Sequence, residues 1–291
     1  MKTHITTLNN MAGTASLAHR RVLKVAQSIG CHEMGLSFYH LKPDYAKEID
    51  KRLDGIIAPL NYGDIVIFQY PSWIGVNYDE SFVNKIKSYR DTKLIIFVQD
   101  IQKLMFDSEQ AILDMEIRTL NKADLLILPS KKMHRYLKEN GLDEKPVIYQ
   151  TIWDMPSDIC FVDHAVTRCF HFAGNYNRFP FLAEYHGKTY VAASQSEGFG
   201  LTLMEAIGSG LPIVGFDVRY GNQTFIDDGQ NGYKIPITDE MDQKEKIKLL
   251  SERIVRMFTE DDMDAFSEHS YEKAKEYLTK EVVHRWIEML K

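Results

Sequence analysis

The chain has 291 residues, of which 44% are hydrophobic and 26% are charged. This composition is ordinary for a globular protein and leaves room for two domains of about 100–200 residues each, so a disordered chain and a small disulfide-stapled fold are excluded. With 35 Lys and Arg against 41 Asp and Glu, the net charge is -6. No overall positive field attracts nucleic acid or an anionic membrane, and we expect neither as a partner.

The cysteines and the apolar runs bear on cellular location. Cys31, Cys160 and Cys169 are too irregularly spaced for a disulfide framework, and no cluster of Cys and His has the spacing of a metal site. The first residues lack the apolar core of a signal peptide, and no apolar run approaches the ~20 residues of a membrane span. The sequence therefore predicts a cytoplasmic protein without a metal ion or a membrane span.

The first half alternates short apolar runs with helix-period segments, which is typical of a parallel sheet with crossover helices. Strands are expected at His4–Leu8, Asp64–Phe68, Lys93–Val98 and Asp124–Leu128, with weaker candidates at Met34–His40 and Pro146–Tyr149. Helices are expected at Ser16–Ser28, Tyr45–Ile57, Glu80–Tyr89, Glu109–Asn121 and Lys131–Glu139. These elements predict a Rossmann-like domain over residues 1–150.

Residues 151–167 show little periodicity and are expected to link this domain to a second α/β domain over residues 168–291. The second domain has expected strands at Cys169–Ala173, Thr189–Ala193, Pro212–Phe216 and Gly232–Ile235, and a helix at Leu201–Ile207. The region from Met241 onward is helix-rich, with an apolar face made by Tyr271, Ala274, Tyr277, Leu278, Val282 and Trp286. We expect that face to pack in a core rather than to bind a partner.

The segment with the clearest chemistry follows a predicted strand and opens a predicted helix. Gly198 and Gly200 would let the backbone approach a ligand, and the first amides of the helix attract an anion because of the helix dipole. Seven residues lie between Glu197 and Glu205, so two carboxylates flank this helix start. Carboxylates accept hydrogen bonds from sugar hydroxyls. The pattern predicts a site for a phosphate-bearing sugar ligand; the alternative is an ordinary helix start with a solvated Glu205.

This pattern resembles the E-x7-E signature of glycosyltransferases with the GT-B architecture, in which two Rossmann-like domains enclose a nucleotide-sugar. Residues 221–224 (GNQT) and 228–232 (DGQNG) extend the resemblance to bacterial transferases that place N-acetylglucosamine on serine-rich-repeat adhesins. The resemblance implies that Glu197 contacts the donor sugar and that Glu205 holds the ribose. It also implies contacts to the sugar and diphosphate from Gly198, Phe199, Gly200, Leu201 and Thr202.

A different resemblance is carried by residues 4–15, 51–58, 66–73, 104–106 and 172–179. They are similar to the glucosyltransferases that add the second sugar to the same adhesins. The resemblance implies that Arg178 binds the donor diphosphate, a role that suits a guanidinium group, although a surface ion pair is the alternative. The loop at Gly13 and Thr14 follows the first strand, so it would face the ligand from the other side.

The two resemblances meet near His186-Gly187-Lys188. Only 15 residues separate Gly174 from Tyr190, whereas complete relatives have further strand and helix units between the corresponding strands. We therefore infer a natural or engineered hybrid with a shortened second domain. Lys188 is a candidate for the second basic residue of diphosphate binding.

Asp100 is the best-placed carboxylate for a general base, because it follows the strand at Lys93–Val98 and loops after parallel strands form the ligand crevice. Related enzymes tend to have His-Asp here, but this chain has Gln99-Asp100, and a glutamine cannot take up the proton. The alternative is that Asp100 caps the next turn.

Residues 70–73 (YPSW) offer an aromatic platform for a sugar ring, or they pack between domains.

Two further patterns are set aside. Asp262-Met263-Asp264 matches the metal-binding D-x-D motif of another transferase fold, but it lies in an acidic run before a predicted helix, so it indicates a helix start. Gly208-Ser209-Gly210 follows a helix instead of a strand and does not indicate a dinucleotide site.

Together these patterns predict a metal-independent GT-B glycosyltransferase without a cofactor. It would transfer a hexose or N-acetylhexosamine from UDP-glucose or UDP-N-acetylglucosamine to a glycan or to Ser/Thr of a protein acceptor. Arg178 and the loop amides would stabilise the departing diphosphate. A homo-oligomer is expected. The competing hypotheses are a non-catalytic subunit that keeps a nucleotide-sugar or acceptor site and an inert hybrid that keeps the two-domain scaffold.

Overall fold

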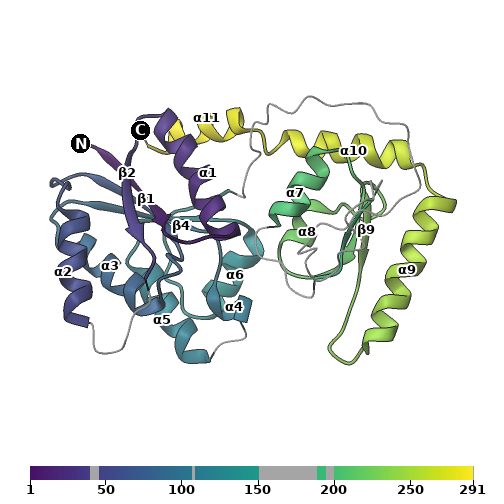
Figure 1. Cartoon of the computed structure of the whole chain (residues 1–291), viewed down its shortest axis with the longest axis horizontal. Coiled ribbons are helices and arrows are strands. Elements are labelled where there is room, and N and C mark those ends of the chain that lie inside the picture. The colour runs from purple at the N-terminus through teal and green to yellow at the C-terminus, as the bar shows by residue number, and fades with distance from the viewer. Residues whose placement is uncertain (40–45, 107–108, 151–188, 195–199, 291) are drawn as a thin grey trace. The chain divides into compact units, whose positions relative to one another are not determined.

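The computed structural model describes residues 1–39, 46–106, 109–150, 189–194 and 200–290. Contacts divide the chain into two units, Met1–Ile152 with Val282–Lys291, and Trp153–Glu281. Each unit contains a parallel sheet with helices packed on it (Figure 1), which confirms the predicted α/β class. In the part of the chain that the structure describes, no helix is long and apolar enough to cross a bilayer.

The first unit is built on six parallel strands in the order β2-β1-β3-β4-β5-β6. They are β1 (Thr3–Asn9), β2 (His32–Ser37), β3 (Ile65–Tyr70), β4 (Lys93–Val98), β5 (Leu125–Leu128) and β6 (Val147–Tyr149). Every residue of β3 is buried, as expected for an internal parallel strand that is covered on both faces. In the edge strand β2, four of the six residues are exposed. All six predicted strands are present.

The described helices of the first unit up to residue 150 are α1 (Thr14–Ser28), α2 (Ala46–Ile57), α3 (Val76–Ser88), α4 (Gln102–Phe106), α5 (Gln110–Asn121) and α6 (Lys131–Glu139). Helix α1 packs on β1 and β2, while α2, α3 and α5 pack side by side in that order. Helix α3 begins at Val76, before the predicted start at Glu80. The prediction missed the first turn because the buried Asp79 interrupts its apolar pattern. The prediction missed α4 altogether.

Helix α6 shows how local sequence sets the ends of a helix. The Ser130 side chain caps it by accepting a hydrogen bond from the Met133 backbone N at 3.1 Å. At the other end Gly141 has φ +99°, and the Leu142 N–H donates to the Leu137 carbonyl at 2.9 Å. The predicted bounds of α6, and the stop at Asn140-Gly141, are confirmed.

Helix α11 (Thr279–Met289) contributes to the first unit from Val282 onward. Val282 is 0% and Trp286 2% exposed, and the Trp286 ring meets Phe97 of β4 edge-on, with centroids 5.9 Å apart at 78°. The prediction placed all residues after 168 in the second domain. The division differs because Trp286 is buried in the core of the first unit.

The second unit has three described parallel strands in the order β7-β8-β9. Its described elements are β7 (Tyr190–Ala192), α7 (Leu201–Gly208), β8 (Ile213–Phe216), α8 (Gly221–Phe225), β9 (Gly232–Ile235), α9 (Gln243–Thr259) and α10 (Met263–Lys275). Helix α9 packs on β8 and β9, whereas α7 packs with α10. The predicted strand at Cys169–Ala173 lies outside the described residues.

Helices α9 and α10 begin at acidic caps. Asp242 and Glu245 form a capping box at α9, with the Glu245 N–H donating to Asp242 at 2.8 Å and the Asp242 N–H donating to Glu245 at 3.0 Å. Asp262 caps α10 by accepting hydrogen bonds from the backbone N of Asp264 and Ala265. The D-x-D pattern is therefore a helix start, as predicted.

The predicted apolar face of the C-terminal region is divided between two helices. Helix α10 ends at Lys275 and α11 begins at Thr279, so Tyr271 and Tyr277 belong to the second unit while Trp286 belongs to the first. Tyr277 is buried against Phe225, which confirms core packing there, but Tyr271 is 37% exposed and is not a core residue.

Candidate functional site

Gly200 stands at the start of α7 in the left-handed conformation, with φ +67°. A β-carbon there would lie 2.9 Å from Leu203 Cδ1, 3.1 Å from Gly221 Cα and 3.2 Å from Phe225 Cδ2. Both the backbone conformation and the close approach of α8 require glycine. A side chain at this position would thus collide with the protein itself, and the glycine fixes how the chain enters α7.

The first two turns of α7 carry three predicted site residues. Thr202 and Glu205 are exposed, and because they are three residues apart they lie on the same helix face, while Leu201 is half-buried. The unpaired amides and the dipole of a helix start favour a negative ligand beside these side chains. The structure thus brings Gly200, Leu201, Thr202 and Glu205 together; the predicted Arg178, Glu197, Gly198 and Phe199, and Lys188, lie outside the described residues.

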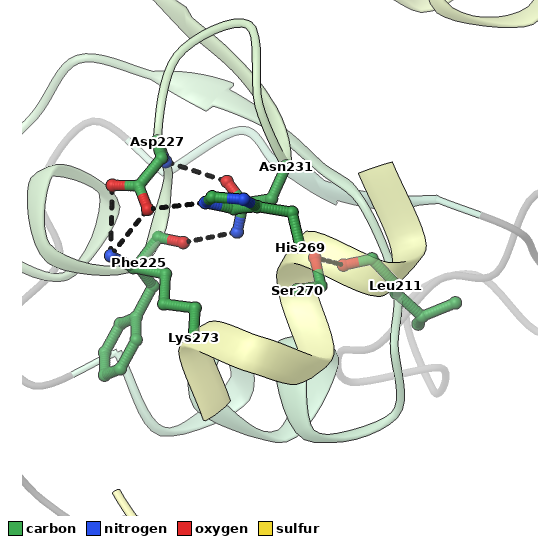
Figure 2. A network of polar contacts seen from close by, with 7 residues as sticks. All are labelled: Leu211, Phe225, Asp227, Asn231, His269, Ser270 and Lys273. Carbon is green, nitrogen blue, oxygen red and sulfur yellow. Dashed lines mark hydrogen bonds and ion pairs between the residues drawn. The ribbon is translucent and has the colours of Figure 1, made fainter. Parts of the chain in front are cut away.

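A polar network joins α10 to the turn between α8 and β9 (Figure 2). Asp227 accepts hydrogen bonds from Lys273 Nζ at 3.0 and 2.9 Å and pairs with His269 Nε2 at 3.2 Å. Asn231 closes the turn, since its Oδ1 accepts from the Asp227 N–H at 2.7 Å and its Nδ2 donates to the Phe225 carbonyl at 3.0 Å. Burial raises the pKa of Asp227, but the hydrogen bonds and charges of Lys273 and His269 outweigh it and lower that pKa. The network fixes α10 to the turn between α8 and β9.

Helix α10 also holds the turn that follows α7. Ser267 donates to the Gly210 carbonyl at 2.6 Å, and Ser270 donates to the Leu211 carbonyl at 3.0 Å, a contact that Figure 2 also shows. The Tyr271 ring covers Gly210, where a β-carbon would come within 2.3 Å of Cε2. Gly208 and Gly210 therefore lie at the end of a helix, as predicted, and not at the strand-to-helix turn of a dinucleotide fingerprint.

On the first unit, Gly13 and Asp100 follow β1 and β4, which are parallel and both adjacent to β3. They therefore lie at the same edge of the sheet, where α/β proteins bind ligands. Gly13 has φ +111° and no atom within 4 Å of the position of a β-carbon, and Thr14 is the first residue of α1. Among the described residues, nothing fills the space beside Gly13.

Asp100 is 8% exposed, and its Oδ1 accepts a hydrogen bond from the Ile101 N–H at 2.9 Å. This is the capping contact named as the alternative to a general base. A carboxylate can accept several hydrogen bonds, so the cap and a role toward a ligand are compatible.

The glutamine that precedes Asp100 belongs to a buried chain of amides. Gln99 Nε2 donates to Gln69 Oε1 at 2.7 Å, and Gln69 Nε2 donates to the carbonyls of Thr6 at 2.6 Å and His19 at 3.0 Å. The chain joins β4, β3, β1 and α1, which gives Gln99 a structural role. Burial of His19 lowers its pKa to about 4, so this imidazole is neutral near pH 7.

Two buried carboxyl groups hold the loops after β3 and β4, and the sequence patterns did not reveal them. The first is Asp79, which accepts hydrogen bonds from the Ser72 hydroxyl and, at 3.4 Å, from the Ser72 N–H. The Ile74 N–H in turn donates to Ser72 Oγ at 3.2 Å, so Asp79 fixes the turn after β3. An acidic residue between Tyr78 and Phe82 on the buried face of α3 was the available signal.

The second carboxyl group is Glu116, on the buried face of α5. Its Oε1 accepts hydrogen bonds from the Tyr70 hydroxyl at 3.1 Å and the Gln102 N–H at 2.8 Å, and its Oε2 accepts from the Lys103 N–H at 3.2 Å. Burial raises the pKa of Glu116, and these three hydrogen bonds oppose the rise. The acid interrupts an apolar stripe that includes Leu113 and Leu120, and this interruption was the signal for it.

The buried Asp79 makes stability depend on pH. Burial raises its pKa from 3.8 to about 7, against the hydrogen bonds from Ser72. The folded state therefore holds the proton more tightly than the unfolded state, and the associated stability is present below about pH 4 and lost as the pH rises through about 7. We expect Asp79→Asn to remove this loss, so that the variant gains stability relative to the wild type as the pH rises from about 4 to about 7 in urea unfolding. A difference that does not change with pH would contradict this.

Residues 2–152 match the family model described as Glucosyltransferase 3-like, N-terminal domain. The chain belongs to the glucosyltransferase 3-like family. Residues 167–264 match a second model, Glycosyl transferases group 1, in the region that carries α7 and Glu205.

Two curated relatives each match a portion of this family member. Glucosyltransferase 3 of Streptococcus parasanguinis is 38% identical over 187 residues, which are 64% of this chain and 56% of the relative. The GtfA subunit of a UDP-N-acetylglucosamine–peptide N-acetylglucosaminyltransferase from Limosilactobacillus reuteri subsp. suis is 54% identical over 103 residues, 35% of this chain and 20% of the relative. The chain thus spans 56% of the first of these curated relatives and a smaller part of the second.

Solved structures confirm the GT-B-like fold class. The GtfA/B complex matches with a TM-score of 0.58 and 25% identity, over 86% of this chain and 62% of that chain. Sucrose-phosphate synthase from Thermosynechococcus elongatus matches with a TM-score of 0.71 over 100% of this chain and 98% of that chain. At 11% identity the second likeness shows the fold alone.

Proposed function

We propose that the chain is a glycosyltransferase that moves a hexose or N-acetylhexosamine from a UDP-sugar to a glycan or to Ser/Thr of a protein. The observation that carries the proposal is the start of α7, where Thr202 and Glu205 are exposed on one face beside the left-handed Gly200. A helix start attracts phosphate, and a neighbouring carboxylate accepts ribose hydroxyls. The relatives named as UDP-sugar and glucosyl transferases support the same chemistry.

The donor would be held without a metal ion or a cofactor. In this proposal Glu205 holds the ribose, Glu197 orients the sugar, and Arg178 with the amides at Gly198–Thr202 faces the diphosphate. Fixed donors aimed at the departing diphosphate stabilise the charge that develops there. UDP-glucose and UDP-N-acetylglucosamine are the proposed donors.

The acceptor would lie at the carboxyl edge of the first sheet, near Gly13, Thr14 and Asp100. Phe106 is 63% exposed, and its ring meets Trp73 at 86° with centroids 6.5 Å apart. An exposed aromatic ring can stack on the apolar face of a sugar. This favours a glycopeptide acceptor. Asp100 would act as the general base that takes the proton of the acceptor's attacking hydroxyl.

Binding of UDP tests the donor site. Saturation with UDP at about 100 times Kd should add about 2.7 kcal/mol to the stability of the wild type, seen as a rise in Tm. We expect Glu205→Ala to lose most of that rise because the ribose loses its acceptor. Glu268→Ala, which removes another exposed carboxylate of the second unit, should keep it. An unchanged rise in Glu205→Ala would contradict the site.

The second candidate function is a non-catalytic subunit that binds a nucleotide-sugar or an acceptor, or an inert hybrid scaffold. It is favoured by one fact, that the chain spans 56% of glucosyltransferase 3. Release of UDP from a UDP-sugar in the presence of a glycopeptide supports the enzyme. Stabilisation by UDP without release supports the subunit, and a lack of UDP binding supports the scaffold. A homo-oligomer in the cytoplasm remains a prediction.

A further inference from the structure

We propose that Glu116 is a positioning residue, which fixes the loop between β4 and α4 and thereby the position of Asp100. The inference rests on the proposed function, because the placement of Asp100 matters to turnover only where a sugar is transferred. It concerns a side chain that is buried inside the first unit, since Glu116 is 0% exposed.

Glu116 does for α4 what a capping side chain does for an ordinary helix. The first amides of a helix have no partner within it, and the five-residue α4 is too short to be stable alone. Here the amides of Gln102 and Lys103 donate to Glu116, 14 and 13 residues away on α5, at 2.8 and 3.2 Å. Hydrogen bonds to a carboxylate are stronger than those to a neutral acceptor, so the start of α4 is held by α5.

The same carboxylate ties this loop to the end of β3. Tyr70, the last residue of β3, is 1% exposed and donates its hydroxyl to Glu116 Oε1 at 3.1 Å. The rings of Trp73 and Phe106 make a second contact between the two segments. The loops that follow β3 and β4 therefore form one connected structure with a buried charge at its base.

Asp100 is held on both sides by these contacts. On one side the Gln99 side chain is bonded to Gln69 of β3, and on the other Ile101 is fully buried and Gln102 is bonded to Glu116. A general base must lie within hydrogen-bond reach of the proton it takes, and a misplacement of about 1 Å can cost about 100-fold in rate. Loss of the Glu116 carboxylate should therefore lower kcat while the donor site stays intact.

The test uses Glu116→Gln in the full chain. Glutamine keeps the volume and one accepting oxygen, but its NH₂ group would face the Lys103 N–H, so two donors oppose each other. We expect kcat for transfer to a glycopeptide to fall about 10- to 100-fold. The rise in Tm with UDP should be unchanged, and hydrogen exchange should speed up in peptides that contain Gln102 and Lys103.

Two further variants accompany it. Tyr70→Phe removes the hydroxyl alone, so it should leave exchange at Lys103 unchanged and lower kcat by less than Glu116→Gln does. Should Glu116→Gln fail to fold, an unchanged kcat in Tyr70→Phe overturns the positioning role. Asp114→Asn, at an exposed position on the same helix, should behave as the wild type.

Two results overturn the positioning role: unchanged exchange in Glu116→Gln, or faster exchange with an unchanged kcat. A wild type that binds UDP and shows no turnover overturns the proposed function instead, and exchange in Glu116→Gln then still decides whether the carboxylate holds the loop.

Discussion

Gly232→Ala should lower the free energy of unfolding by about 4 kcal/mol or more, an exceptional loss for one methyl group. A β-carbon at Gly232 would lie 1.8 Å from the Ile213 carbonyl oxygen and 2.6 Å from its carbon. Gly232 is paired with Ile213 in the parallel ladder of β8 and β9. The atoms that the β-carbon would meet belong to the Ile213 backbone, so no change of rotamer relieves the contact. Urea unfolding followed by circular dichroism measures the loss.

The matched control for this prediction is Gly229→Ala, in the turn just before β9. Gly229 has φ +73° and no atom within 4 Å of the position of a β-carbon. Only the left-handed backbone opposes alanine there, at a cost of about 1–2 kcal/mol. Equal losses in the two variants would show that the approach of β8 to β9 does not set the requirement at Gly232.

Asp100→Asn should lower the turnover of a UDP-sugar with a glycopeptide acceptor by about 10²- to 10⁴-fold, because an amide cannot take the proton of the attacking hydroxyl. The Asn side chain still accepts a hydrogen bond from the Ile101 N–H, so the fold and the rise in Tm with UDP should be unchanged. UDP release under saturating donor measures the rate.

The control for this variant is Asp143→Asn, which changes an exposed carboxylate of the same unit and should keep full turnover. If Asp100→Asn keeps a rate within about threefold of the wild type, far less than the loss of a general base causes, Asp100 caps the turn and does nothing more.

The strands and the long helices follow from sequence because their signal is local. The apolar run Lys93–Val98 has the bounds of β4, and Lys131–Glu139 has the bounds of α6, where Ser130 and Gly141 mark both ends. Helices α4 and α8 were missed, since five residues are too few to show a helical period. The place of Trp286 was also missed, because its partner is about 190 residues away in the chain and only tertiary structure joins them.

The candidate site was predictable on the donor side and less so on the acceptor side. A glycine followed by a helix with Glu205 is a local pattern, and α7 confirms the helix start. The roles of Glu197 and Arg178 stay predictions. Glu116 and Asp79 escaped prediction because a buried carboxylate is explained by the amides and hydroxyls that surround it, and these come from other elements.

The burial of Trp286 against Phe97 affects how the protein is made. A growing chain folds from its amino end, and domains usually complete themselves as they leave the ribosome. The first unit cannot do so, because α11 is translated after every residue of the second unit. Until Trp286 is translated, the apolar surface around Phe97 lacks the indole that packs against it. Exposed apolar surface of this kind favours the binding of chaperones during synthesis.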